Sequence, residues 1–306
     1  MPLSYRRCLT LVIALIIGVG SPMLAQARPD LERKIGTTLV DSKSPDYQFS
    51  DLHFTSADGQ RRYRVRIIKP RIAPPLGGYP VIYFLDGNAV LMELNAQLLA
   101  QLAVQKQPPV LVLLSYDNDL RIDSKGRSYD YTPASQQGSG KQPHGGADAF
   151  LKLIDTQIKP AVAAQVTVNP QQQTLWGHSY GGLFVLHTLL TQPATFQNYI
   201  AVEPSLWWGK GFILQEAQRV MDRHPSLSAH LQLWIGGAEK MREAPPIIRQ
   251  SQLPADAAHG LATQLATLDG LKVDYREWAG LDHGAMLGAA IPPALEGIAK
   301  GEAAGK

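Results

Sequence analysis

The segment 177–182 contains the residues whose types and spacing most clearly suggest chemistry. Its sequence is Gly-His-Ser-Tyr-Gly-Gly, and it lies between an apolar run that ends at Trp176 and a helical pattern that begins at Leu183. A strand, Gly-x-Ser-x-Gly and a helix in this order form a sharp turn that exposes the serine hydroxyl, and its glycines let the backbones pass closely. Ser179 is therefore predicted to be a nucleophile.

A serine nucleophile of this kind needs a histidine base, and a carboxylate that orients the base usually lies between the two in the chain. His283, in a loop after the last predicted strand, is the expected base. Glu239, which follows the predicted strand 231–235, is the expected acid. Glu203 and Asp282 compete for that role, and a Ser–His dyad without an acid is a further alternative.

The negative charge that develops on an attacked ester carbonyl needs two hydrogen-bond donors. One is the backbone N–H of the residue after the nucleophile, which is Tyr180. The other comes from the loop after the third strand of the sheet, so the backbone N–H of Asn88 is expected there, with that of Gly87 as the next choice. One such donor stabilises the transition state by about 3–4 kcal/mol.

The pattern of apolar residues predicts the elements that must position these groups. Short apolar strands alternate with helices, which favours one α/β domain with a mostly parallel sheet covered on both faces. The predicted strands are 47–55, 62–69, 81–85, 110–114, 173–176, 199–202, 231–235 and 273–278. The predicted helices are 91–104, 147–164, 181–190, 212–223, 261–268 and 286–298, the last with a break near the prolines at 292 and 293. Alternation in 62–69 predicts an edge strand. The polar segments 116–146 and 238–260 stay unassigned, and loops of that length are usually functional or disordered.

The first 27 residues are predicted to be a signal peptide. Arg6 and Arg7 precede an apolar run from 8 to 20, and Ala-Gln-Ala at 25–27 has the form of a signal peptidase site. An uncleaved anchor and twin-arginine export are alternatives. Cleavage after Ala27 leaves residues 28–306 as a single catalytic domain, and we expect it in a bacterial periplasm.

Composition narrows the classes of partner. The net charge is +3, and it falls to +1 without residues 1–27, because that segment carries two arginines and no acid. This charge is too small to predict nucleic-acid binding. The single cysteine, Cys8, excludes an intrachain disulfide, and the eight histidines show no HExxH spacing. We expect no metal site, no cofactor and a monomer without a membrane span.

Several segments together resemble known proteins. The segments 81–87, 177–182, 204–208 and 282–284 resemble the esterase-D-like branch of α/β-hydrolases, and 127–133 and 145–150 resemble the periplasmic trilactone siderophore esterases that act on enterobactin and salmochelin. The resemblance implies an α/β-hydrolase fold and a serine esterase that opens the trilactone of a catecholate siderophore, in its ferric form, to help release iron. Glu203 departs from the pattern, since a small residue is expected before Pro204.

A ferric tris-catecholate is anionic and aromatic, so the resemblance implies matching side chains near the nucleophile. Arg127 offers a planar cation for catecholate oxygens, and Trp207 and Trp208 offer aromatic faces. Arg121 and His144 are weaker candidates from the same loop. Two other functions stay open: a secreted carboxylesterase acting on acylated sugars or aryl esters, and a siderophore-binding protein on a silent hydrolase fold.

Overall fold

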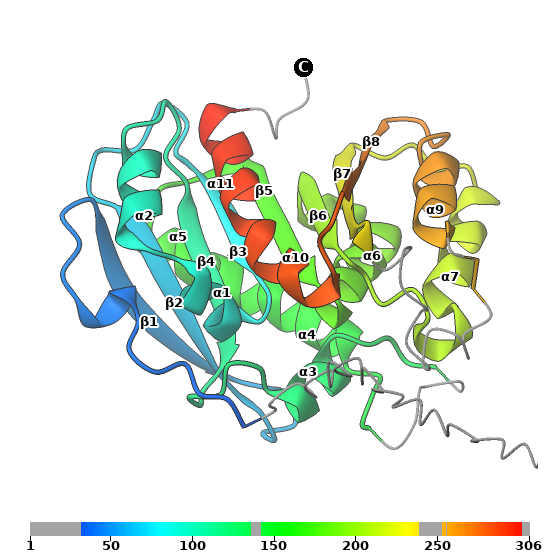
Figure 1. Cartoon of the computed structure of the whole chain (residues 1–306), viewed down its shortest axis with the longest axis horizontal. Helices are drawn as coiled ribbons and strands as arrows, with labels where there is room; N and C mark the ends of the chain where they lie inside the picture. Colours follow the sequence, from blue (N-terminus) through cyan, green and yellow to red (C-terminus); the bar gives the residue numbers. More distant parts are fainter. Residues whose placement is uncertain (1–31, 136–141, 239–252, 255, 302–306) are drawn as a thin grey trace, which may run out of the picture. The chain divides into compact units, whose positions relative to one another are not determined.

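The computed structural model describes residues 32–135, 142–238, 253–254 and 256–301 (Figure 1). An eight-stranded sheet has the order β1-β2-β4-β3-β5-β6-β7-β8. The strands are β1 (Tyr47–Thr55), β2 (Arg62–Pro70), β3 (Tyr79–Phe84), β4 (Val110–Tyr116), β5 (Val168–His178), β6 (Asn198–Val202), β7 (Ala229–Gly236) and β8 (Leu271–Trp278). Only β1 with β2 and β2 with β4 pair antiparallel, so the predicted mostly parallel α/β sheet is confirmed.

The prediction of β2 as an edge strand is wrong. This strand pairs with β1 on one side and with β4 on the other. Its alternating pattern arises because one face carries three arginines, of which Arg62 is exposed and Arg64 and Arg66 are half-buried beside polar partners. Arg66, for example, faces Asp51 across the β1–β2 ladder and forms a bidentate ion pair with it, with both contacts at 2.8 Å.

Helices cover both faces of the sheet (Figure 1). They are α1 (Gly87–Glu93), α2 (Ala96–Ala103), α3 (Ser124–Asp130), α4 (Ala147–Leu153), α5 (Lys159–Gln165), α6 (Tyr180–Thr191), α7 (Phe212–Met221), α9 (Ala257–Leu265), α10 (His283–Ala289) and α11 (Ile291–Lys300), and the short turns are η1 (Leu39–Asp41), η2 (Ile154–Ile158), η3 (Pro193–Thr195) and η4 (Trp208–Lys210). Residues of α4 to α7 and α9 belong to one apolar cluster, and residues of α1, α2, α10 and α11 belong to the other. No helix in the described part of the chain is long and apolar enough to cross a membrane.

Three predicted helices are divided by local breaks. The helix predicted at 91–104 is two helices, and Asn95 caps the second one by accepting a hydrogen bond from Leu98 N. The helix at 147–164 contains the π-turn η2 between α4 and α5. The helix at 286–298 is α10 and α11, because the two prolines at 292 and 293 favour the first turn of a new helix.

The long polar segment 116–146 contains α3, which the sequence pattern did not predict. A buried carboxylate fixes this helix to the sheet. Asp130 accepts hydrogen bonds from the hydroxyls of Tyr63 and Tyr116 at 2.8 and 2.9 Å, and from Arg61 Nε at 2.9 Å. Burial raises the pKa of Asp130, although the Arg61 charge and the three hydrogen bonds oppose that rise. The network fixes the position of α3 and therefore of Arg127.

His187, buried in the middle of α6, forms an ion-paired link between three helices. Its Nδ1 lies 2.8 Å from Glu216 Oε2 on α7, and its Nε2 lies 3.0 Å from Asp148 Oδ1 on α4. Burial alone would lower the pKa of His187, but the two carboxylates raise it to about 9. The imidazolium form is therefore the form that the fold stabilises.

Because the folded pKa of His187 lies above its ordinary value of 6.5, this link stabilises the fold fully below about pH 6.5. The stabilisation is lost as the pH rises from there through about 9. We expect a His187→Gln variant to lack this loss, which amounts to roughly 3 kcal/mol of unfolding free energy. Urea unfolding of both proteins between pH 6 and 10 measures it, and parallel pH profiles of the two proteins would contradict the assignment.

Candidate active site

The backbone conformation of Ser179 is that of a nucleophile elbow. Ser179 lies between β5 and α6 with φ 61° and ψ −117°, a strained conformation for a residue with a side chain. Gly177 makes the turn possible, because a Cβ there would lie 2.4 Å from the backbone of Gly181. A Cβ at Gly182 would lie 2.9 Å from Pro204 Cα. The predicted strand, turn and helix are thus present around the serine.

The Ser179 hydroxyl has a polar neighbour on the segment that follows β6. Its Oγ lies 3.3 Å from Oγ of Ser205, a buried residue whose backbone N–H donates to the Ser179 carbonyl. In the sequence, Ser205 is marked only as part of the segment 204–208, which carries the family resemblance. The contact shows that the segments after β5 and β6 meet at the nucleophile, as expected where parallel strands end at one edge of a sheet.

His283 begins α10, and its side chain contacts a buried carboxylate. Its Nδ1 lies 3.2 Å from Oε2 of Glu203, the residue directly after β6. The other carboxylate oxygen of Glu203 accepts a hydrogen bond from the backbone N–H of Gly236. A carboxylate that accepts from Nδ1–H fixes the tautomer of the ring and leaves Nε2 to act as a base.

Two other acidic residues are candidates from the sequence for the carboxylate that orients His283. Glu239 lies outside the described residues, so its prediction as the acid stays a prediction. Asp282 caps α10 instead, since its side chain accepts a hydrogen bond from Ala285 N at 2.9 Å. Among the described residues, Glu203 is the carboxylate that contacts His283 Nδ1.

His178, next to the nucleophile, forms a hydrogen bond with the backbone of His283. Its Nε2–H donates to the His283 carbonyl over 2.7 Å, and the two ring centroids are 4.6 Å apart. Burial, followed by the charge of His283, holds the pKa of His178 well below its ordinary value. A neutral His178 ring adds no positive charge beside the base. Sequence reasoning missed this residue, because nothing in the elbow motif distinguishes it.

The start of α1 supplies the second set of candidate donors. Asp86 is the N-cap residue, and its carbonyl accepts from the N–H groups of Ala89 and Val90. The N–H groups of Gly87 and Asn88 lie in the first turn, where no partner within α1 exists for them. The predicted donor at Asn88 thus lies at a helix start that is suited to bind an oxyanion.

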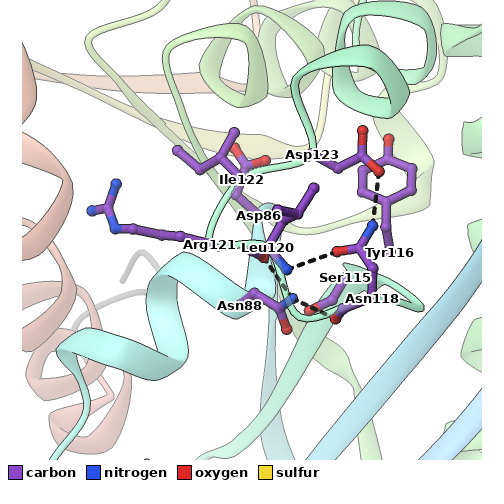
Figure 2. Close-up of a pocket in the computed structure, with 9 residues that line it drawn as sticks. All are labelled: Asp86, Asn88, Ser115, Tyr116, Asn118, Leu120, Arg121, Ile122 and Asp123. Atoms are coloured by element: carbon purple, nitrogen blue, oxygen red, sulfur yellow. Dashed lines mark hydrogen bonds between the residues drawn. The ribbon is translucent and has the colours of Figure 1, made fainter. Parts of the chain in front are cut away.

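Asn88 is fixed from the other side by its own amide. Its Nδ2 donates to the carbonyls of Asn118 and Leu120 at 3.1 and 2.8 Å (Figure 2). A cavity of about 10 Å³ adjoins it, which is room for one water at most. Its lining residues are Asp86, Asn88, Ser115, Tyr116, Asn118, Leu120, Arg121, Ile122 and Asp123. This side of α1 is therefore packed, and the Asn88 position is held firmly.

The predicted substrate-binding side chains have different environments. Trp207 is half-buried, and its ring centroid lies 5.9 Å from that of Tyr180. Trp208 is 1% exposed and packs against Phe212, so its ring lies in the core. Arg127 is 12% exposed in its side chain and forms an ion pair with Asp86 at 2.8 Å. Of the two tryptophans, Trp207 is therefore the one that presents a partly open aromatic face, beside Tyr180.

The weaker candidates are also engaged. Arg121 Nη2 lies 3.5 Å from Glu93 Oε1, and its Nε is buried with no hydrogen-bond partner among the described residues. The ring nitrogens of His144 contact the carbonyls of Gln142 and Ser135, so both nitrogens have partners within the protein.

A parallel sheet with a strained serine after β5, a histidine after β8 and a carboxylate on that histidine defines a serine hydrolase of the α/β-hydrolase type. Residues 56–238 match the family model described as putative esterase, and the chain belongs to this family. It is a serine ester hydrolase.

The chain is also similar to individual proteins that are named as esterases. The chain is 35% identical over 297 residues to the apo-salmochelin esterase of Escherichia coli O6:H1, which covers 94% of this chain and 88% of that protein. It is 31% identical to the ferri-bacillibactin esterase BesA of Bacillus subtilis, over 79% of this chain and 86% of the relative. The structure of the enterobactin hydrolase IroE in complex with DFP, 35% identical, matches with a TM-score of 0.72 over 85% of this chain and 98% of that one.

Proposed function

We propose that this protein hydrolyses the ester bonds of a catecholate siderophore trilactone of the enterobactin and salmochelin type. The observation that carries the proposal is the strained elbow of Ser179, whose neighbour His178 contacts the backbone of His283, while His283 Nδ1 contacts a buried carboxylate. Relatives named as salmochelin and bacillibactin esterases, which extend over most of the chain, support the substrate class.

The reaction follows from the roles of the residues. His283 Nε2 takes the proton of Ser179 while the serine oxygen attacks a lactone carbonyl. The backbone N–H groups of Tyr180 and Asn88 hold the oxyanion, and Glu203 keeps the histidine in the tautomer that can accept the proton. The C–O bond of the lactone breaks, and the alkoxide takes the proton from His283. This hydroxyl stays at the far end of the linear chain, whose acyl end is now attached to Ser179. Water then attacks the acyl-enzyme, with His283 as base, and releases the free acid.

The aromatic rings of the substrate need flat partners. Trp207 and Tyr180 lie side by side next to the nucleophile, and both are half-buried, so they offer faces on which a catechol ring can stack. The anionic oxygens of the substrate attract cations. Arg121, which is 22% exposed in its side chain, lies on the adjoining loop, whereas Arg127 is already ion-paired with Asp86.

The N-terminal segment supports a periplasmic location, because its charged start, apolar run and Ala-Gln-Ala site have the form of an export signal. Opening the macrocycle there weakens its hold on iron and helps to release the metal. The iron is part of the substrate in this proposal, so the protein needs no cofactor of its own.

The test is a product analysis with the purified mature protein. Enterobactin, in ferric and iron-free form, and a neutral aryl ester are supplied at equal concentration, and mass spectrometry follows ring opening. We expect linear products from the trilactone and at least tenfold slower cleavage of the aryl ester. Ser179→Ala serves as the control without a nucleophile. Good cleavage of the aryl ester with intact enterobactin would favour a general carboxylesterase, and no labelling by a fluorophosphonate would favour a binding protein.

A further inference from the structure

The sequence predicts that Arg127 binds the substrate, but most of its guanidinium is already engaged inside the protein. Its Nε lies 3.0 and 3.2 Å from the two oxygens of Asp86, and its Nη2 lies 2.8 Å from Asp86 Oδ2. The same Nη2 donates to the His178 carbonyl at 3.2 Å. Asp86 is 4% exposed in its side chain, so this ion pair is buried.

The two partners of Arg127 belong to the two halves of the proposed oxyanion hole. Asp86 is the N-cap of α1, directly before the Gly87 and Asn88 N–H groups. His178 is the last residue of β5, directly before Ser179 and the Tyr180 N–H. Because these halves lie on separate segments, their spacing depends on contacts that join the segments.

Further contacts fix the ion pair in place. The backbone N–H of Asp86 donates to the hydroxyl of Tyr131, at the end of α3. The Arg127 guanidinium lies over the rings of Tyr180 and Tyr131, with its central carbon 5.2 and 5.6 Å from their centroids. The Asp86 charge raises the pKa of Arg127 in spite of burial. The arginine is therefore rigid, charged and enclosed.

We propose that Arg127 is a positioning residue that joins the loop after β3 to the nucleophile elbow and so sets the spacing of the two oxyanion donors. This rests on the proposed function only in so far as Ser179 attacks an ester. A planar fork with five donors suits this role, since one guanidinium can bind a carboxylate in bidentate form and a carbonyl at the same time. Loss of the link moves one donor relative to the other, and displacements near 1 Å cost about 100-fold in rate.

The experiment compares a polyanionic and a neutral substrate. Arg127→Gln and Arg127→Lys are assayed on iron-free enterobactin and on p-nitrophenyl butyrate, together with the rate of Ser179 labelling by a fluorophosphonate. We expect kcat and the labelling rate to fall roughly 10- to 100-fold, by the same factor on both esters and with little change in KM. Lysine keeps the charge but lacks the fork, so it should restore little.

Two controls separate this effect from a loss of folding. Arg66 forms a bidentate ion pair with Asp51 on the β1–β2 hairpin, and its side chain is 12% exposed, as that of Arg127 is. Arg66→Gln therefore removes a comparable ion pair away from the active site and should leave kcat unchanged. The double variant Asp86→Asn with Arg127→Gln avoids a lone buried charge. It should lower kcat no further than the worse single variant, because both changes break the same link.

The outcomes are distinct. A rise in KM for enterobactin alone, with normal cleavage and labelling on neutral reagents, would overturn the proposal and make Arg127 a substrate contact. Unchanged kinetics on both esters would also overturn it. If enterobactin is not a substrate at all, the proposed function fails, while the neutral ester and the labelling rate still test the positioning role.

Discussion

Replacing Glu203 by glutamine is expected to lower kcat by roughly 10³-fold with little change in KM. Glutamine has the shape of glutamate, and its amide oxygen can still accept from Gly236 N. Its NH₂ group, however, would face His283 Nδ1 with a donor in place of an acceptor. The histidine would then be held in the tautomer that cannot take the serine proton, a change that costs about 10⁴-fold in a well-formed triad.

Glu239→Gln is the matched control for this prediction. The same chemical change after β7 tests the acid position that the sequence favours. We expect it to leave kcat within about threefold, and both variants are assayed by kcat on a neutral aryl ester and by the fluorophosphonate labelling rate of Ser179. A large loss in Glu239→Gln with a small loss in Glu203→Gln would assign the acid to Glu239. Small losses in both would make the protein a Ser–His dyad.

Gly177→Ala is expected to abolish labelling of Ser179 and to lower the unfolding free energy by roughly 3 kcal/mol or more. The added Cβ would lie 2.4 Å from the carbonyl carbon and oxygen of Gly181. Both of these atoms belong to the backbone, so no side chain can rotate to make room. The strand and the helix would have to separate, which would displace the serine between them.

Gly181→Ala is the control within the same motif. A Cβ at Gly181 would have its nearest contact at 3.4 Å, with Leu85 Cβ, which is an ordinary distance. We expect the unfolding free energy of this variant to stay within about 1 kcal/mol of the wild type. Denaturant unfolding measures both variants. Equal losses in the two would mean that the motif needs flexible backbone in general and that the close approach at Gly177 is not decisive.

Ser179 and His283 could be predicted from sequence because local patterns mark them. The nucleophile lies in a six-residue motif with its strand and helix on either side, and apolar runs identify the buried strands. Glu203 is different, because it can contact His283 only where the end of β6 meets the start of α10, 80 residues further along the chain. No local pattern reports that contact, and the sequence favours the acid after β7 instead.

The same limit applies to Arg127 and the two tryptophans. A charged residue in a polar segment appears solvated, and α3 is too short and too rich in Ser, Gly and Tyr to be recognised from its sequence. The ion pair with Asp86 follows from the way the Asp130 network fixes α3 to the sheet. Trp207 and Trp208 are neighbours of one residue type, and only the tertiary packing decides which of them is buried.

Left-handed backbone is concentrated at the active site. The non-glycine residues with positive φ in the described part of the chain are Asp86, Ser179, Glu203, Lys210 and His224. Three of these, Asp86, Ser179 and Glu203, form the site, and such conformations cost on the order of 1–3 kcal/mol each. Selection for stability alone would therefore favour glycine at these positions and erode the site over evolutionary time. Their side chains persist against that pressure only while the organism gains from the reaction.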